Sequence, residues 1–262
     1  MNRSVSRRRL MQAAPLALPL SAAMAEPAPA PESGALEVFP VQPTAMVREM
    51  VSVSHGNFKR VKELVETHPS LAKAAWDWGF GDWETALGAA SHTGSRDIAE
   101  YLIEKGAPPT LFSATMLGHL EAVQTLIRAQ PGVQRIPGPH SISLLAHAKN
   151  GGPKAAKVYE YLESLGDAGS PPSAPMTDEE CAALAGTYTF GSGPTDQIEI
   201  KALKARLEFQ RAGTVSRGLV HLGDHVFHPA GASAVRIKFT GSGAATVLTV
   251  SDPDVVLTAR RT

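Results

Sequence analysis

The stretch from Gly81 to Ala107 reads GDWETALGAASHTGSRDIAEYLIEKGA, and it decides the fold of the first half of the chain. A small-residue segment around Ala90 is followed by Gly94, which predicts a helix that ends in a tight turn. After this glycine, apolar residues recur at helical spacing at Ile98, Leu102 and Ile103. The stretch therefore predicts two short antiparallel helices, with small residues where the two approach closely.

The same unit recurs on both sides of this stretch. Four glycines each precede an apolar face at helical spacing, and they are 38, 24 and 34 residues apart: Gly56, Gly94, Gly118 and Gly152. One helix pair cannot bury its own apolar face, but a stack of pairs shares a continuous core. We therefore predict about four stacked helix pairs in residues 45–168.

The 81–107 stretch resembles the ankyrin repeat, whose pattern is GxTPLHxAAxxGHxEVVxLLLxxGA. The matching residues are Thr85, Leu87, Ala90, Gly94, Ile98, Leu102, Gly106 and Ala107. Ala86 stands in place of the usual proline and Gly88 in place of the usual histidine, so the copy is degenerate. The resemblance implies a repeat stack whose concave face and inter-repeat loops bind a partner.

From Met176 onward the pattern changes to the period of two that is typical of strands. Thr177 and Glu180 have the spacing of a capping box at the start of a short helix. Eight strands are expected at short intervals, in residues 186–190, 197–201, 205–210, 218–222, 225–227, 234–239, 246–250 and 255–259.

The LxGxY string of Leu184, Gly186 and Tyr188, with the apolar strings that follow it, resembles the small lipocalin-like β domain appended to some secreted β-lactamase-related hydrolases. The resemblance implies an accessory, non-catalytic domain in residues 176–262. The predicted fold class is α+β in two domains: an ankyrin-type helical repeat stack, then a small antiparallel β-barrel or curled sheet.

The first 25 residues have the pattern of an export signal, with four arginines, an apolar run and a small-x-small site that predicts cleavage after Ala25. Arg7 and Arg8 lie in the string SRRRLM, which resembles the twin-arginine signal that exports folded bacterial proteins. An ordinary secretory signal or a retained N-terminal anchor is the alternative. Proline-rich linkers are predicted at 26–44 and 169–175, and the mature protein is expected to be periplasmic or secreted, without a membrane span.

The charge and cysteine content exclude several classes of protein. The chain has 25 Lys and Arg against 25 Asp and Glu, and removal of the signal leaves a net charge of −4. Such a balance argues against a nucleic-acid-binding protein. The one cysteine, Cys181, rules out an internal disulfide framework and a zinc site built on several thiolates, and we expect it to be a buried, inert thiol.

All three tryptophans lie in one short loop together with acidic residues. Aromatic side chains of this kind are enriched in binding hot spots, and in an exported protein they can also stack on sugars. The alternative is that the indoles pack over the ends of the repeats. The candidate binding residues are Trp76, Asp77, Trp78, Phe80, Asp82, Trp83 and Glu84.

The histidines give two further observations. His55, His92 and His119 lie near the turn glycines, and His140 and His147 flank the first helix of the fourth unit, so we interpret all five as consequences of the repeat and not as a metal site. In the C-terminal segment, His221, Asp224 and His225 surround a predicted Gly223-Asp224 hairpin turn, where His221 and His225 are the candidate metal ligands.

No nucleophile elbow, zinc-protease helix, phosphate-binding loop or dinucleotide fingerprint is present in the sequence. The leading hypothesis is a non-catalytic exported interaction module that binds an envelope protein through the repeat face and the tryptophan loop, without a cofactor. The alternative is binding of a small ligand or glycan by the β domain or the tryptophans, and an enzyme without a recognisable motif is the third hypothesis.

Overall fold

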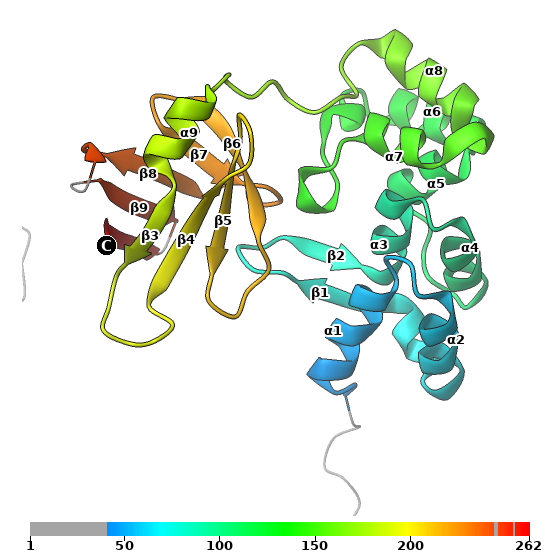
Figure 1. Cartoon of the computed structure of the whole chain (residues 1–262). Coiled ribbons are helices and arrows are strands. Elements are labelled where there is room, and N and C mark those ends of the chain that lie inside the picture. The colour runs from blue at the N-terminus through cyan, green and yellow to red at the C-terminus, as the bar shows by residue number, and fades with distance from the viewer. Residues whose placement is uncertain (1–40, 244–245, 254) are drawn as a thin grey trace, which may run out of the picture. The chain divides into compact units, whose positions relative to one another are not determined.

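A computed structural model describes residues 41–243, 246–253 and 255–262 (Figure 1). The predicted signal, with Arg7, Arg8 and the cleavage after Ala25, and residues 26–40 of the predicted linker lie outside the described residues. Residues Gln42–Thr262 form one compact unit. Within the described part of the chain, no helix is both long and apolar enough to cross a bilayer.

Four helix pairs make up the first part of the described chain. The pairs are α1 (Thr44–Val53) with α2 (Phe58–Thr67), α3 (Ala86–Thr93) with α4 (Arg96–Glu104), α5 (Leu111–Leu117) with α6 (Leu120–Ala129), and α7 (Leu144–Asn150) with α8 (Ala156–Leu165). The first helices of successive pairs pack side by side, α1 against α3, α3 against α5 and α5 against α7. The pairing expected from the glycine spacing is therefore observed.

Two of the turn glycines are required by their backbone geometry. Gly94 and Gly118 end α3 and α5 in the left-handed region, with φ of 76° and 80°. A side chain at either position would also press on a backbone carbonyl of the fourth helix pair, that of Asn150 at Gly94 and that of Lys154 at Gly118. Glycine thus allows both the turn and the close packing of the pairs.

The connections between the pairs carry short elements of their own. A 3₁₀ helix, η1 (Pro69–Lys73), and an antiparallel hairpin of β1 (Ala75–Asp77) and β2 (Trp83–Thr85) fill the long interval before α3. Between α6 and α7 lie η2 (Val133–Arg135) and η3 (Pro139–Ser141), and η4 (Gly152–Ala155) precedes α8. The tryptophan loop is therefore a β-hairpin.

The C-terminal part is a closed antiparallel barrel, preceded by α9 (Asp178–Leu184), which begins with the predicted capping box. Its strands are β3 (Gly186–Thr189), β4 (Gln197–Ala202), β5 (Leu207–Arg211), β6 (Arg217–Gly223), β7 (Val226–Pro229), β8 (Arg236–Thr240), β9 (Val247–Asp252) and β10 (Val255–Arg261). Each pairs with its neighbour in sequence, and β10 closes the barrel against β3. All eight strands were expected from the sequence, and the prediction of a barrel is confirmed.

Apolar side chains fill the barrel interior. Tyr188, Phe227 and Phe239 meet edge to face there, with ring centroids 5.6–5.7 Å apart. The Tyr188 hydroxyl donates to the carbonyl of Leu184 at 2.8 Å, so its polar atom is satisfied. Cys181 is buried in the same core, and burial raises the pKa of its thiol, which is consistent with the predicted inert cysteine.

Candidate metal centre

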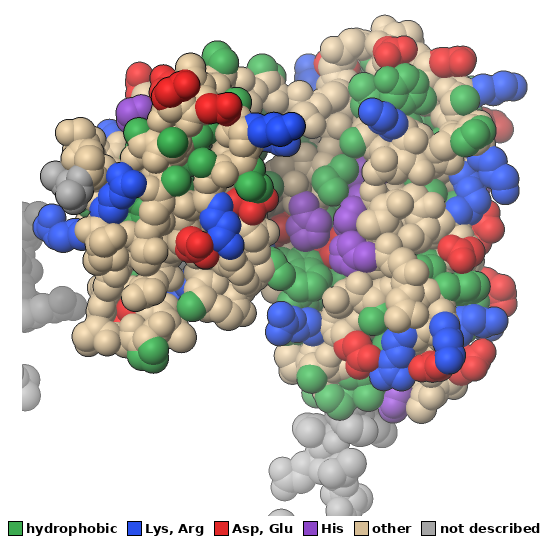
Figure 2. Space-filling model, in the orientation of Figure 1, with side chains coloured by type: hydrophobic (Ala, Val, Ile, Leu, Met, Phe, Trp, Pro, Cys, Tyr) green, Lys and Arg blue, Asp and Glu red, His purple; other side chains and the backbone are tan. Residues whose placement is uncertain are grey.

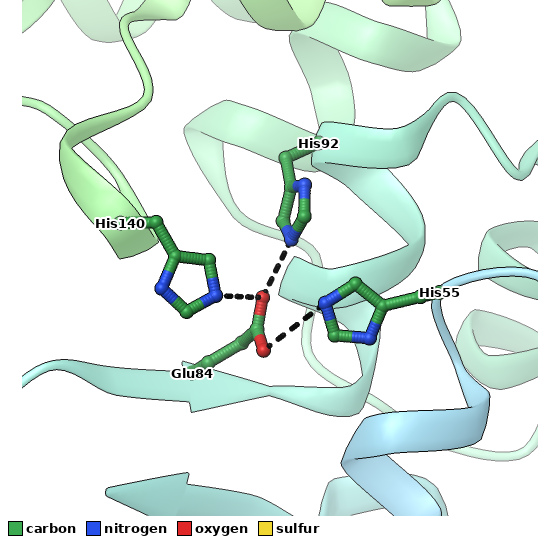
Figure 3. A group of neighbouring side chains, drawn as sticks. All are labelled: His55, Glu84, His92 and His140. Atoms are coloured by element: carbon green, nitrogen blue, oxygen red, sulfur yellow. Dashed lines mark hydrogen bonds and ion pairs between the residues drawn. The ribbon is translucent and has the colours of Figure 1, made fainter. Parts of the chain in front are cut away.

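The centre is built around the carboxylate of Glu84 in β2. Residues alternate in direction along this strand, so Trp83 is 64% exposed while Glu84 is buried. Four groups surround the Glu84 oxygens: the indole Nε1 of Trp78 at 2.8 Å and the Nε2 atoms of His92, His140 and His55 at 2.7, 3.4 and 3.5 Å. Figure 3 shows the three histidines around this carboxylate. A buried carboxylate needs such partners to offset its desolvation.

The three histidines come from three separate segments. His55 lies in the turn after α1, His92 in the last turn of α3 and His140 in η3. Because α1 and α3 pack side by side, the ends of the two helices bring His55 and His92 together, with ring centroids 4.9 Å apart. The connection between α6 and α7 adds His140, whose ring lies 5.4 Å from that of His92.

The hydrogen bonds of His55 and His140 determine which ring nitrogen carries the proton. The Nδ1 of His55 faces two carbonyl oxygens at the end of α1, at 3.2 and 2.9 Å. The Nδ1 of His140 lies 2.7 Å from Oδ2 of Asp82. Carbonyl and carboxylate oxygens only accept, so Nδ1 is the donor in both rings. In a neutral ring, Nε2 then carries a lone pair, and in both histidines it points at the Glu84 carboxylate.

A strained backbone supports this position of His140. His140 and Ser141 have φ of 58° and 61°, in the left-handed region that side chains other than glycine rarely adopt. Asp82 holds His140 there with both oxygens, because Oδ1 accepts the backbone N–H at 2.9 Å while Oδ2 accepts from the ring. Strain of this kind is typical of functional sites.

Without a metal ion, protons balance the negative charge of the centre. Burial acts to raise the pKa of Glu84, but hydrogen bonds with His140 and His92 outweigh it and lower that pKa to about 2. Burial acts to lower the pKa of His140, but its bonds with Asp82 and Glu84 raise it to about 9. The protonated His140 ring is therefore the cation of the metal-free centre.

Two further buried side chains adjoin the cluster. Arg217 in β6 places Nη1 3.3 Å from Oδ2 of Asp82, so Asp82 links Arg217 to His140. His147 in α7 donates from Nδ1 to the carbonyl of Ser143 at 2.9 Å, and burial lowers its pKa to about 4. His147 is thus a neutral ring at neutral pH, 6.4 Å from His92 between ring centroids.

This donor set fits a transition-metal ion. The ligand atoms of His55, Glu84, His92 and His140 all lie within 4.8 Å of one another. Imidazole nitrogen and carboxylate oxygen are standard zinc ligands, and tetrahedral zinc places neighbouring ligand atoms about 3.4 Å apart. The contacts of Glu84 with His140 and His55, 3.4 and 3.5 Å, are in this range.

The residues predicted from the tryptophan loop separate into two groups in the structure. Trp76 and Trp78 are partly buried against the helical core, and Asp77 accepts the N–H of Gly79 within the hairpin. The acidic side chains were expected beside the indoles at the surface, but the structure places Asp82 and Glu84 in the interior. Phe80 and Trp83 are exposed.

The structure also changes the interpretation of the histidines. Sequence reasoning attributed His55, His92 and His140 to the repeat alone, and the structure brings them together at Glu84. The similar positions of His55 and His92, one and two residues before the turn glycines of adjacent units, were a signal of this contact. His119 does not join the cluster.

The candidate metal ligands of the β6–β7 hairpin do not come together into a metal site. Among the described residues, His221, Asp224 and His225 form no group close enough to hold a metal ion. The ring of His221 instead stacks on Phe227, and its Nδ1 lies 3.2 Å from the carbonyl of Ala174. The turn itself is observed, with positive φ at Asp224 and His225, one residue later than predicted.

Comparison with known proteins identifies no relative: no protein-family model, no curated protein and no solved structure matches the chain.

Proposed function

We propose that this protein binds one divalent transition-metal ion, such as Zn²⁺, through His55, His92, His140 and Glu84. The observation that carries the proposal is the orientation of His55 and His140. Each ring uses Nδ1 as a donor, so Nε2, the nitrogen that faces the buried carboxylate, is the one left to bind a metal ion once it gives up any proton. In the metal-free centre the proton of His140 balances the Glu84 charge. One metal ion can replace that proton and bind all four groups at once, because their ligand atoms lie within 4.8 Å of one another.

The donor types favour a transition metal over calcium or magnesium. Ca²⁺ and Mg²⁺ prefer oxygen ligands, whereas three imidazole nitrogens and one carboxylate suit zinc, copper, iron and nickel. The outer contacts are also those of a metal centre, because histidine ligands commonly donate their second ring N–H to a carboxylate or a carbonyl. Asp82 has this role for His140, and the carbonyls at the end of α1 have it for His55.

The centre is accessible from solvent on one side. The side chains of His55 and His140 are 33% and 30% exposed, whereas those of His92 and Glu84 are almost fully buried. An ion can therefore enter past the two outer rings and settle against the two inner ligands. Metal binding is the function proposed for this centre, and no reaction is assigned to it.

The test is a titration of the purified, chelator-treated protein with Zn²⁺ and Co²⁺. We expect one ion per chain, and a cobalt spectrum that indicates nitrogen and oxygen ligands. His92→Ala and Glu84→Gln should each weaken zinc binding by more than the roughly 10- to 100-fold typical of a lost outer contact. His119→Ala is the matched control, a turn histidine outside the cluster, and should bind as the wild type does. Wild-type protein that binds no zinc, or unchanged affinity in both cluster variants, would refute the proposal.

The finer features of the fold and the cellular location belong to the same proposal. The helix pairs are ankyrin-type repeats and the barrel is lipocalin-like, supported by the left-handed turn glycines and by the order of the eight strands. The chain is exported through its twin-arginine-type signal, supported by Arg7 and Arg8 in the sequence. Because that route carries folded proteins, the metal would be bound before export. Fractionation of cells that express Arg7→Lys/Arg8→Lys protein tests the route, and unchanged export would contradict it.

A second candidate function, binding of an envelope protein, rests on the exposed aromatic side chains of the hairpin. Trp83 is 64% exposed and Phe80 is also exposed, which is unusual for side chains of this size. If they contact a partner, Trp83→Ala should lose a protein captured by crosslinking in the periplasm while the fold and zinc binding remain. Loss of a bound glycan instead would favour the sugar-binding alternative, and retention of all ligands would exclude this surface.

A further inference from the structure

A cavity of about 270 Å³ opens beside the candidate metal centre. His55 and His140 line it together with Trp78, Arg217 and Gly218, and the remaining wall is Val215, Ser216 and Ala230. In Figure 2, histidine side chains border a hollow in this face of the molecule. At about 30 Å³ per water molecule, the cavity has the volume of roughly nine waters. It is large enough for a small organic molecule.

Arg217 lines this cavity and has one buried donor atom without a partner. The residue is 8% exposed, and its Nη1 is occupied by Asp82 at 3.3 Å and by the carbonyl of Ala230 at 3.2 Å. Its Nη2 is buried and has no hydrogen-bond partner among the described residues. Buried donors are almost always satisfied, and a charged one left unpaired is costly. The unpaired Nη2 therefore indicates that an acceptor is missing next to this guanidinium, which lines the cavity.

The charges of the site specify the kind of acceptor. Asp82 and Glu84 contribute two negative charges, and Arg217 contributes one positive charge. With a divalent ion bound, as proposed above, the buried groups carry a net charge of about +1. A singly charged anion neutralises this site, whereas a phosphate dianion would leave it negative. Monocarboxylate is the common organic anion of this charge, and a guanidinium is its usual partner.

The other walls of the cavity are apolar. The indole of Trp78 is held in place by its bond from Nε1 to Glu84, and Val215 and Ala230 add aliphatic surface. These groups offer a surface for the hydrocarbon part of a ligand, next to the charged end of Arg217. The lining is thus divided into one anion-binding end and one apolar side.

We infer that this cavity binds a small organic monocarboxylate, with a carboxylate oxygen on Nη2 of Arg217 and the hydrocarbon part against Trp78. This inference rests on the proposed metal function, because the metal supplies the charge that the anion neutralises. The inference concerns binding only.

The test is calorimetric titration of the zinc-loaded protein with benzoate, acetate and inorganic phosphate. We expect benzoate to bind one per chain, acetate more weakly because it lacks the apolar ring, and phosphate more weakly than benzoate. Arg217→Lys keeps the charge beside Asp82 but loses the planar donor pair, and should weaken benzoate binding at least tenfold with zinc retained. Arg206→Met, which removes an exposed arginine of the barrel, is the control and should bind benzoate normally.

A second variant fills the cavity without changing any charge. A Cβ added at Gly218 would meet no atom within 4 Å, so this position has open space, and Gly218→Val should fold and reduce benzoate binding at least tenfold. Zinc bound at one per chain without benzoate binding would overturn this inference and leave the metal proposal standing. Equal benzoate affinity in wild type, Arg217→Lys and Gly218→Val would also overturn it. Failure to bind zinc would instead refute the metal proposal.

Discussion

Asp82 holds His140 at two points, although the two residues are 58 positions apart in the chain. One carboxylate oxygen accepts the backbone N–H at 2.9 Å and the other accepts from Nδ1 at 2.7 Å. The first contact stabilises a left-handed backbone, and the second turns Nε2 toward Glu84. Asp82 is thus a positioning residue that acts on the candidate centre through His140.

Loss of this contact should weaken metal binding without removing a ligand. Asp82→Asn leaves an amide that no longer supplies two anionic acceptors, so the His140 ring loses its orientation. We expect zinc affinity to fall about 10- to 100-fold, as for other outer contacts of histidine ligands. Competition with a chromophoric chelator measures the change. Asp77→Asn, in the same hairpin but away from the histidines, is the control, and equal affinity in both variants would show that Asp82 has no such role.

Metal binding should also raise the thermal stability of the protein. An ion that binds only the folded chain adds about 2.7 kcal/mol at a concentration 100 times its Kd. For a folded unit of this size, such a gain raises Tm by about 5–10 °C. Calorimetric scans with zinc, and again after addition of EDTA, measure the shift. A Tm that rises equally in His92→Ala would mean that zinc binds elsewhere.

His147 should make the protein less stable at mildly acidic pH. Burial lowers the pKa of its ring from 6.5 to about 4, so between these values the unfolded chain binds a proton that the folded chain does not. Above pH 6.5 the ring is neutral in both states and costs no stability. As the pH falls from 6.5 toward 4, protonation of the unfolded chain lowers the free energy of unfolding by up to about 3 kcal/mol. Urea unfolding between pH 4 and 7 should show a weaker pH dependence for His147→Gln than for wild type. Because Asp82 and Glu84 titrate in both proteins, identical slopes would contradict this assignment.

Gly118 should tolerate a side chain less well than Gly166. Both glycines have positive φ, 80° and 76°, so alanine at either position costs about 1–2 kcal/mol of backbone strain. At Gly118 the added methyl also meets the Lys154 carbonyl, whereas at Gly166 it meets no atom within 4 Å. Urea denaturation should therefore find Gly118→Ala less stable than Gly166→Ala by a further 1–3 kcal/mol or so. Equal losses would mean that the helix pairs separate without cost at this point.

Local patterns in the sequence were sufficient for the elements of this fold. The helix pairs follow from apolar spacing around glycines such as Gly94 and Gly118, and the eight strands follow from period-two segments between turns. Both patterns depend on residues only a few positions apart, so they can be recognised directly in the sequence. The β6–β7 turn was displaced by one residue, and the β1–β2 hairpin of the tryptophan loop was not expected.

The candidate centre could be predicted only in part. His55 and His92 lie one and two residues before a turn glycine, and stacking of the units brings the two rings together. His140 has no repeat equivalent, because it reaches the centre through a loop held by Asp82. The inward direction of Asp82 and Glu84 also had no local signal, since a short strand does not indicate which of its two faces is buried.

By itself, then, the sequence determined the helix pairs, the barrel strands and the glycine turns, since each depends on contacts close along the chain. Only the tertiary structure decided that three histidines share one carboxylate, because they approach it from segments up to 85 positions apart, from His55 to His140. The tertiary structure also places Arg217 of the barrel beside this centre, where its guanidinium contacts the buried carboxylate of Asp82. Such long-range contacts depend on how the faces of whole helices and strands pack together, and no short segment of sequence determines that packing.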